Sequence, residues 1–181
     1  EIRLSLVGSE MCIRDRDNQG VVMQYQVRPA VPADAPQVSQ VILAALLASN
    51  AQDYPASVIE RVQASFTPDA VRQLMQRRQM FVALVHGELR GTASLDGRAV
   101  RSVFVGPAYH GQGLGRQLMA AVEQAALDSG QTSLVVPSSV TAEGFYARLG
   151  FVRVREHYEG EELTLIMERA LVAAETGPGL G

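Results

Sequence analysis

The stretch from residue 103 to residue 116 most constrains what this chain can fold into. It begins with an apolar run that favours a strand, residues 103–105, and Gly106 and Pro107 end that run. Glycines follow at alternate positions, 111, 113 and 115, and an amphipathic pattern begins at once. Glycine lets a backbone approach a ligand closely, and a helix start adds unpaired N–H groups and a positive dipole end. The stretch therefore predicts a strand–loop–helix unit that binds a phosphate or pyrophosphate group.

Two well-known phosphate-binding loops do not fit this stretch. Gly106 and Gly111 have the glycine spacing of a Walker loop, but Gln112 stands where that loop needs lysine. A dinucleotide fingerprint reads G-x-G-x-x-G, whereas Gly111, Gly113 and Gly115 alternate, and the loop lies in the middle of the chain. The plainer alternative is a structural strand–helix turn without a ligand.

Composition limits the classes of protein and partner. The 181 residues suit one domain, and 47% hydrophobic with 19% charged residues indicates a globular chain with a sizeable core. A net charge of −3 gives no indication of nucleic acid or an anionic membrane as the main partner. The one cysteine, Cys12, excludes an internal disulfide and a cysteine-based zinc cluster, so a reducing cytoplasm is the default location.

The two ends differ from the middle of the chain. Residues 1–22 combine an apolar stretch too short for a signal peptide or a membrane anchor with a charged run. We expect this segment to be disordered or non-native, with Met23 as the start of the regular pattern. Residues 23–171 are expected to form a single domain, and residues 172–181 a flexible tail.

Periodicity and turn signals divide the rest of the chain into elements. The first part of the chain is expected to form a strand at 25–28, a helix with Asp34 as its N-cap, and helices starting at Pro55 and Pro68. Strands are expected at 80–85, 90–95 and 99–105, followed by a helix from 114 that Gly130 ends and a strand at 132–136 that Pro137 stops. The last part is expected to form a short helix near 145 and a hairpin of strands at 152–158 and 163–167, with alternation on its first arm. The strands on either side of the long helix need a crossover, so they should lie parallel.

A second motif lies at residues 138–151. Ala142, Phe145 and Leu149 share a helix face, Gly150 ends that helix, and Phe151 starts a strand. On its own, this pattern also fits a packed helix with an aromatic pair.

Together the two motifs resemble the GNAT superfamily of N-acetyltransferases. The run from His110 to Gly115 fits the acetyl-CoA pyrophosphate loop R/Q-x-x-G-x-G/A, with histidine in place of the first Arg or Gln. The later run fits A-x-x-F-Y-x-x-x-G-F, about thirty residues further on. The resemblance covers roughly residues 24–171. It implies an α/β (α+β) fold, in which a mixed, mostly antiparallel sheet of about seven strands has helices on both faces and a parallel fourth and fifth strand splayed to admit the cofactor.

The resemblance also implies a reaction and a set of site residues. The activity would be transfer of an acetyl group from acetyl-CoA to a primary amine of a small molecule or peptide. Tyr146 would be the general acid for the coenzyme thiolate, and an N–H at or near Val105 would polarise the thioester carbonyl. The hydroxyl of Ser138 or Ser139 would contact the coenzyme, although many relatives have asparagine there. The candidate cofactor-binding residues are Val103, Phe104, Val105, His110, Gly111, Gln112, Gly113, Leu114, Gly115, Arg116 and Ser139.

The general base and the acceptor site are left open. Relatives often carry a glutamate on the fourth strand, where this chain has Arg101 and Ser102. Possible bases are Asp96, His86 and Glu143, and bulk water is another route for the proton. The candidate acceptor contacts are Asp53, Tyr54 and Glu60. We expect Arg72, Arg77 and Arg78 on a solvated face. Because the strand glutamate is missing, a non-catalytic acyl-CoA-binding domain stays an alternative, as does an α/β domain without a cofactor. The final hairpin could support a homodimer.

Overall fold

The computed structural model of the chain describes residues 15–16, 22–23, 25–50 and 55–172. Strand β1 (Asp15–Arg16), in the segment expected to be disordered or non-native, pairs antiparallel with β2 (Val22–Met23), which ends one residue beyond that segment. The rest of residues 1–22, nearly all of the expected tail, and the acceptor candidates Asp53 and Tyr54 lie outside the described residues.

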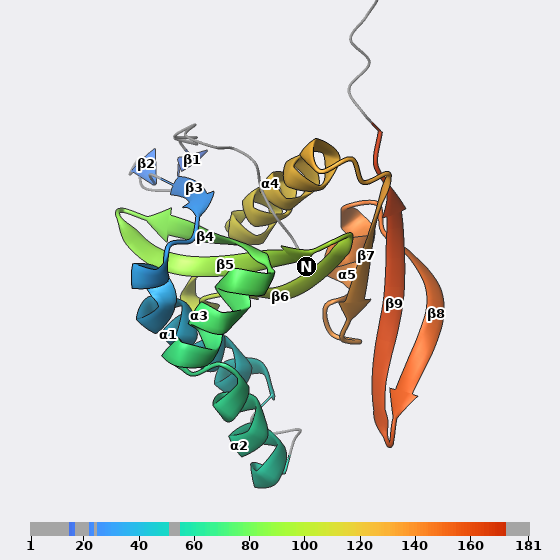
Figure 1. The fold of residues 1–181 in the computed structure, drawn as a ribbon, viewed down its shortest axis with the longest axis horizontal. Helices are drawn as coiled ribbons and strands as arrows, with labels where there is room; N and C mark the ends of the chain where they lie inside the picture. The colour runs from blue at the N-terminus through green and yellow to red at the C-terminus, as the bar shows by residue number, and fades with distance from the viewer. Residues whose placement is uncertain (1–14, 17–21, 24, 51–54, 173–181) are drawn as a thin grey trace, which may run out of the picture.

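A mixed seven-stranded sheet organises the domain (Figure 1). In spatial order its strands are β3 (Tyr25–Pro29), β4 (Gln79–Val85), β5 (Glu88–Asp96), β6 (Ala99–Val105), β7 (Ser133–Ser138), β9 (Glu162–Ala170) and β8 (Val152–Glu159). The helices are α1 (Ala35–Asn50), α2 (Ala56–Ser65), α3 (Pro68–Arg77), α4 (Leu114–Asp128) and α5 (Glu143–Arg148). Every pairing is antiparallel except β6 with β7, which are parallel, so the expected fold class is confirmed.

Helices cover both faces of the sheet and create two cores. Strand β4 separates them: Val82 packs with α1 and α3, whereas its neighbour Ala83 packs with α4. Because both faces of β4 are buried, its sequence is a continuous apolar run instead of an alternating one. The apolar stripe of α4 is buried as expected, and Gly130, with a φ of 81°, follows its end.

The N-terminal connection differs from the expectation in one detail. Asp34 ends a short 3-10 helix, Pro32–Asp34, immediately before α1. Its carboxylate accepts two hydrogen bonds from Arg28, at 2.7 and 2.9 Å, and one from the Val31 amide at 2.8 Å. The Asp34 side chain therefore fixes the turn behind it instead of capping α1. The starts at Pro55 and Pro68 are confirmed, and the Thr67 hydroxyl caps α3 by accepting from the Ala70 N–H.

Strand β7 runs through Pro137, where we expected it to stop. The N–H of Val135 donates to the Arg98 carbonyl next to β6, so the nitrogen of Pro137, two residues on, faces the same side. There β6 no longer pairs with β7, and the missing N–H of proline breaks no ladder.

The alternation expected for the first arm of the final hairpin does not create a buried face. All eight residues of β8 are exposed, including Val152 at 66% and Tyr158 at 60%. The reason is topological, because β8 is an edge strand, and α5 reaches it through the Glu143–Arg153 ion pair instead of an apolar face. Use of this hairpin in a homodimer stays a prediction.

None of the helices in the described ranges is long and apolar enough to cross a membrane.

Candidate functional site

The parallel strands β6 and β7 are joined at one end and open at the other. Ala99 and Val135 form their single ladder pair in the described chain. Arg98 strengthens this closed end, because its guanidinium donates to Ser133 at 2.9 Å and to Glu168 at 3.0 Å. Beyond it the strands diverge and leave a gap, as the resemblance stated above implies for this parallel pair.

A bulge in β6 sets which groups face the gap. The register of β6 against β5 shifts opposite Thr92 and Ser94, and Ser102 lies in the left-handed region with a φ of 55°. A non-glycine residue in this region carries strain, and such strain concentrates at functional sites. After the bulge, the side chains of Val103 and Val105 pack toward α4, whereas Phe104 packs toward α1 and α3.

The backbone of β6 leaves polar groups pointing into the gap. The Gly106 N–H donates to the Arg90 carbonyl of β5 at 2.8 Å. Since successive N–H groups of a strand point to opposite sides, the Val105 N–H points away from β5, toward the gap. The Val105 carbonyl lies on the same side, 2.9 Å from Nε2 of His110.

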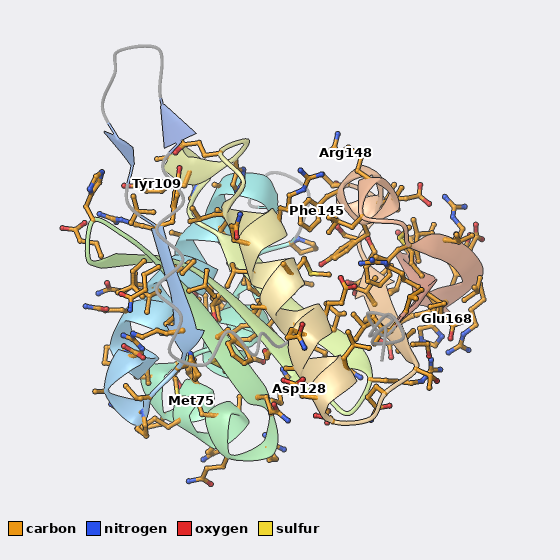
Figure 2. The ribbon with its side chains drawn as sticks, turned by 90° about the horizontal axis from the view of Figure 1, so that it is seen from above. Met75, Tyr109, Asp128, Phe145, Arg148 and Glu168 are labelled. Carbon is orange, nitrogen blue, oxygen red and sulfur yellow. The ribbon has the colours of Figure 1, made fainter. Side chains whose placement is uncertain are left out.

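The glycines of the loop have two different kinds of surroundings. Gly111 and Gly113 have φ angles of 76° and 86°, and a Cβ at either position would meet nothing within 4 Å. They form an open turn at the N-terminus of α4, where free N–H groups and the helix dipole favour an anion. A Cβ on Gly115 would instead lie 3.1 Å from the Phe145 ring, so this glycine allows α5 to pack closely against α4 (Figure 2).

Three other predicted residues are held by local hydrogen bonds. His110 is exposed, and the hydrogen bond between its ring and the Val105 carbonyl holds the loop beside the end of β6. Gln112 donates from Nε2 to the Ala108 carbonyl, and its side chain lines neither cavity of the site. The Ser139 hydroxyl accepts from the Ala142 N–H at 3.2 Å.

Two adjoining cavities open on opposite faces of the sheet at the gap. One, of about 560 Å³, lies between the glycine loop and α5; the other, of about 640 Å³, lies beside α3. Both are lined by Val103, Val105, His110, Thr141, Ala142 and Tyr146. Of the predicted cofactor-binding residues, the first cavity brings together Val103, Val105, His110, Gly111, Gly113, Leu114, Gly115 and Arg116, and the second adds Phe104 and Ser139. The gap thus lies between the two cavities.

Tyr146 lies at the junction of the two cavities. Its ring packs edge-on against Phe145 and Phe151, with centroids 5.1 and 5.7 Å away, and the residue is 6% exposed. Burial raises the pKa of the Tyr146 hydroxyl above its ordinary value of 10. The hydroxyl therefore keeps its proton at neutral pH.

The cavity beside α3 contains charged residues that sequence reasoning did not assign to it. Arg78 was expected on a solvated face, but it is the C-cap residue that follows α3, is half-buried, and donates to the Ser102 hydroxyl at 3.4 Å. Arg101 and Glu162 also line this cavity. Glu162 begins β9 at the tip of the final hairpin, so no local pattern could have indicated its position.

The proposed bases and the remaining acceptor candidate lie elsewhere. Asp96, His86 and Glu143 line neither cavity, and Glu143 forms an ion pair with Arg153 at 2.6 Å. Glu60 is exposed on α2 and lines neither cavity. Among the described residues, no group of three or more His, Cys, Asp or Glu side chains could hold a metal ion.

Comparison with known proteins is consistent with this geometry. The family model of an acetyltransferase (GNAT) domain matches residues 50–169. The uncharacterized N-acetyltransferase YafP of Escherichia coli K12 is 24% identical over 131 residues, which is 72% of this chain and 83% of YafP. A GCN5-related N-acetyltransferase structure from Rhodopseudomonas palustris is 26% identical, with a TM-score of 0.74 over 83% of this chain and 99% of that one. The fold also matches PaiA N-acetyltransferase from Thermoplasma acidophilum, solved with coenzyme A, at 16% identity and a TM-score of 0.72 over 81% and 99% of the two chains. The chain belongs to the GNAT acetyltransferase family.

Proposed function

We propose that this protein transfers an acetyl group from acetyl-CoA to the primary amine of a small molecule or peptide. The observation that carries the proposal is the opening between β6 and β7, with the glycine turn on one face and Tyr146 at the junction. Family membership supports the reaction class, and the relative solved with coenzyme A supports the cosubstrate.

The residues around the glycine loop fit an anionic coenzyme. The turn at Gly111 and Gly113 is open, and it leads directly into a fifteen-residue helix whose first N–H groups can bind phosphate. Arg116 and Arg148 line the same cavity and add positive charge. Positive φ angles and open space at two glycines are what close approach of a diphosphate requires.

When bound, acetyl-CoA supplies an acetyl group activated as a thioester. The Val105 N–H, directed into the gap, is the donor that can stabilise negative charge on a carbonyl oxygen. His110 keeps the neighbouring carbonyl oriented by donating from Nε2 to Val105. Tyr146 holds a proton on Oη that a departing thiolate can take.

The acceptor amine must lose a proton, and the described cavity walls offer one carboxylate for it. Glu162 is the single Asp or Glu among the described lining residues of the two cavities. The acceptor amine can lose its proton to Glu162 or to bulk water in this arrangement.

A non-catalytic acyl-CoA-binding domain is the second candidate. It is favoured by the positions of Asp96, His86 and Glu143, which all lie outside the cavities. Such a protein would bind acetyl-CoA and release no thiol with any amine. A cytoplasmic location stays a prediction, as do the disordered or non-native character expected of residues 1–22 and the flexible tail at residues 172–181.

Calorimetry with acetyl-CoA and free-thiol release over a panel of amines test the proposal. We expect saturable binding and turnover by the wild type, and loss of binding in Gly113→Leu, whose side chain fills the open turn. The matched control is Gly87→Leu, because Gly87 also has a positive φ, 80°, and open space around its Cβ position, but lies in the β4–β5 turn. Equal binding by both variants would contradict the assigned site. Absence of binding by the folded wild type would contradict the function.

A further inference from the structure

The cavity beside α3 carries two guanidinium groups on neighbouring walls. Arg78 comes from the end of α3 and Arg101 from β6, just before the Ser102 bulge. The other ionisable side chains that line this cavity in the described chain are Glu162, at the hairpin tip, His110 and Tyr146. Burial lowers the pKa of the Arg78 guanidinium, and repulsion from Arg101 lowers it further, as expected for two like charges close together, whereas the Asp96 carboxylate acts in the opposite direction.

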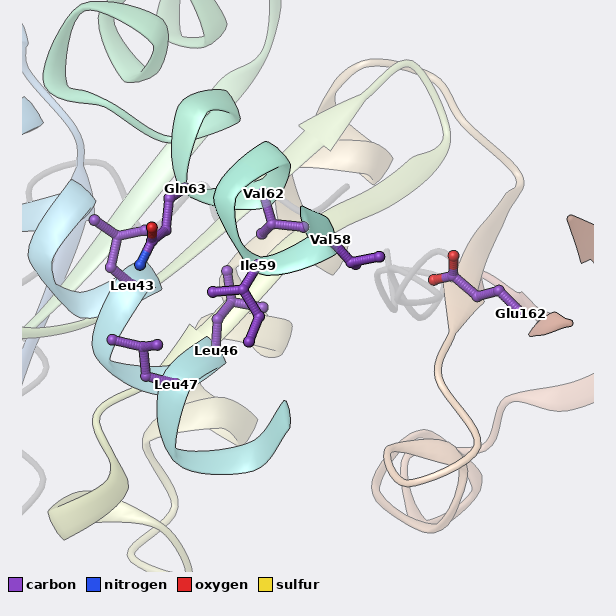
Figure 3. A pocket seen from close by; sticks show the side chains of 8 residues that line it. All are labelled: Leu43, Leu46, Leu47, Val58, Ile59, Val62, Gln63 and Glu162. Carbon is purple, nitrogen blue, oxygen red and sulfur yellow. The ribbon is translucent and has the colours of Figure 1, made fainter. Parts of the chain in front are cut away.

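The same cavity is otherwise largely apolar. Phe66 and Phe104 pack edge-on in its wall, 6.0 Å between centroids, next to Leu74 and Leu46. A smaller apolar groove of about 140 Å³ adjoins it between α1 and α2 (Figure 3). The groove and the cavity share Leu46 and Glu162 as lining residues. Figure 3 shows the Glu162 carboxylate pointing toward α2 from the final hairpin. An apolar cavity of ~150 Å³ is large enough for a benzene-sized group.

We infer that the acceptor is an amine that also carries a carboxylate and an apolar side chain, as an aliphatic or aromatic amino acid does, with Arg78 and Arg101 binding the carboxylate. This inference rests on the proposed acetyl transfer. Arginine matches a carboxylate with paired N–H donors, and its five donors allow the contacts that Arg78 and Arg101 already make to persist. The apolar walls and the adjoining groove take the side chain.

The charge arrangement also bears on how the amine becomes neutral. Two nearby positive charges disfavour an ammonium ion and lower the pKa of an amine bound beside them. An acceptor held by Arg78 and Arg101 would therefore reach its neutral form more easily, without a dedicated base on β6. For the same reason polyamines and other multiply charged cations are poor acceptors for this cavity.

The first test compares binding of matched product analogues to the protein saturated with coenzyme A. N-acetyl-leucine and N-acetyl-leucinamide differ in one charged group, and neither has an amine whose pKa could complicate the comparison. We expect the acid to bind about 10-fold more tightly in ligand-observed NMR titrations, which corresponds to about 1.4 kcal/mol. Arg78→Gln and, separately, Arg101→Gln should each remove most of this preference.

Arg72→Gln is the matched control for the variants. Arg72 lies on the same helix, pairs with Asp69 at 2.8 Å, and lines neither cavity, so its loss should leave the preference unchanged. Should Arg78→Gln fail to fold, Arg101→Gln still decides, because Arg101 is exposed. Equal binding of acid and amide, or no binding of either, would overturn the inference.

The second test measures turnover of leucine and phenylalanine against spermidine and 3-methylbutylamine. We expect at least 10-fold higher kcat/KM for the amino acids. Faster turnover of the cationic amines would overturn the inference while leaving acetyl transfer intact. Failure to bind acetyl-CoA would instead remove the proposed function, and the acid–amide comparison on the free protein would still report on the two arginines.

Discussion

Replacing Tyr146 by phenylalanine tests the central chemical role in the proposed site. The change removes the hydroxyl and keeps the ring, so the edge contacts with Phe145 and Phe151 remain. None of the described residues hydrogen-bonds this hydroxyl. The variant should therefore fold, with a free energy of unfolding within about 1 kcal/mol of the wild type.

The expected kinetic effect follows from the role of the proton on Oη. A positioned general acid contributes roughly 100- to 10,000-fold to rate, or about 2.7–5.5 kcal/mol of transition-state stabilisation. We expect kcat of Tyr146→Phe to fall by this factor while KM for acetyl-CoA changes less than about threefold, because the ring still lines the cavities. Steady-state thiol release at saturating amine measures both constants.

The pH dependence gives an independent check. Because burial raises the Tyr146 pKa above 10, the folded protein holds this proton where an ordinary tyrosine loses it. Wild-type kcat should therefore show no loss of an acid group near pH 10. The free energy of unfolding should decline as pH rises above 10, since only the unfolded chain then releases the proton. Tyr146→Phe should lack this decline.

Tyr158→Phe is the matched control for these measurements. Tyr158 is exposed on β8 and its hydroxyl donates to Glu156, away from both cavities. If Tyr146→Phe kept more than about a third of wild-type kcat, Tyr146 would not be the general acid. The thiolate would then leave with help from another donor.

Two further predictions concern packing and stability. In Gly115→Ala the new Cβ would lie 3.1 Å from the Phe145 ring, which must shift by a few tenths of an ångström. Helix propensity gains about 1 kcal/mol and overpacking costs about 1–3 kcal/mol, so the melting temperature should stay level or fall by up to about 8 °C. Because Tyr146 packs on the Phe145 ring, the shift should also lower kcat several-fold; unchanged kcat would contradict the close-packing role. Asp34→Asn should lower the free energy of unfolding at pH 7 by about 1–3 kcal/mol in chemical denaturation. Burial opposes ionisation of Asp34, but the bonds from Arg28 and the Val31 amide outweigh it and lower its pKa, so the wild type alone loses this stabilisation as pH falls below about 4 toward the folded pKa. An unchanged acid profile in the variant would contradict this account.

The local sequence was enough to predict the strand–loop–helix unit and the turn at its glycines. Gly111, Gly113 and Gly130 all have positive φ angles, and glycine is the residue type that adopts them without steric cost. Starts at Pro55 and Pro68 follow from the fixed φ of proline, and the stripe of α4 follows from the helical period. The parallel pairing of β6 and β7 followed from the crossover alone.

Other features depend on which elements lie beside one another. The face that Phe104 presents depends on the bulge at Ser102, because one extra residue reverses the alternation of a strand. Pro137 stays within β7 because β6 has already diverged there. The valines of β8 alternate like core residues but are exposed, since β8 lies at an edge of the sheet.

The acceptor side was decided by tertiary structure. Arg78, Arg101 and Glu162 come from the end of a helix, the middle of a strand and the tip of a distant hairpin, yet they line one cavity. The residues around each of them in the sequence do not indicate this position, because the local pattern of a charged residue is the same whether its side chain faces solvent or a cavity. Glycine turns and helix starts are set by the backbone of a few consecutive residues, and the sequence therefore reveals them. A binding cavity is set by side chains brought together from remote segments, and only the folded chain shows which ones meet.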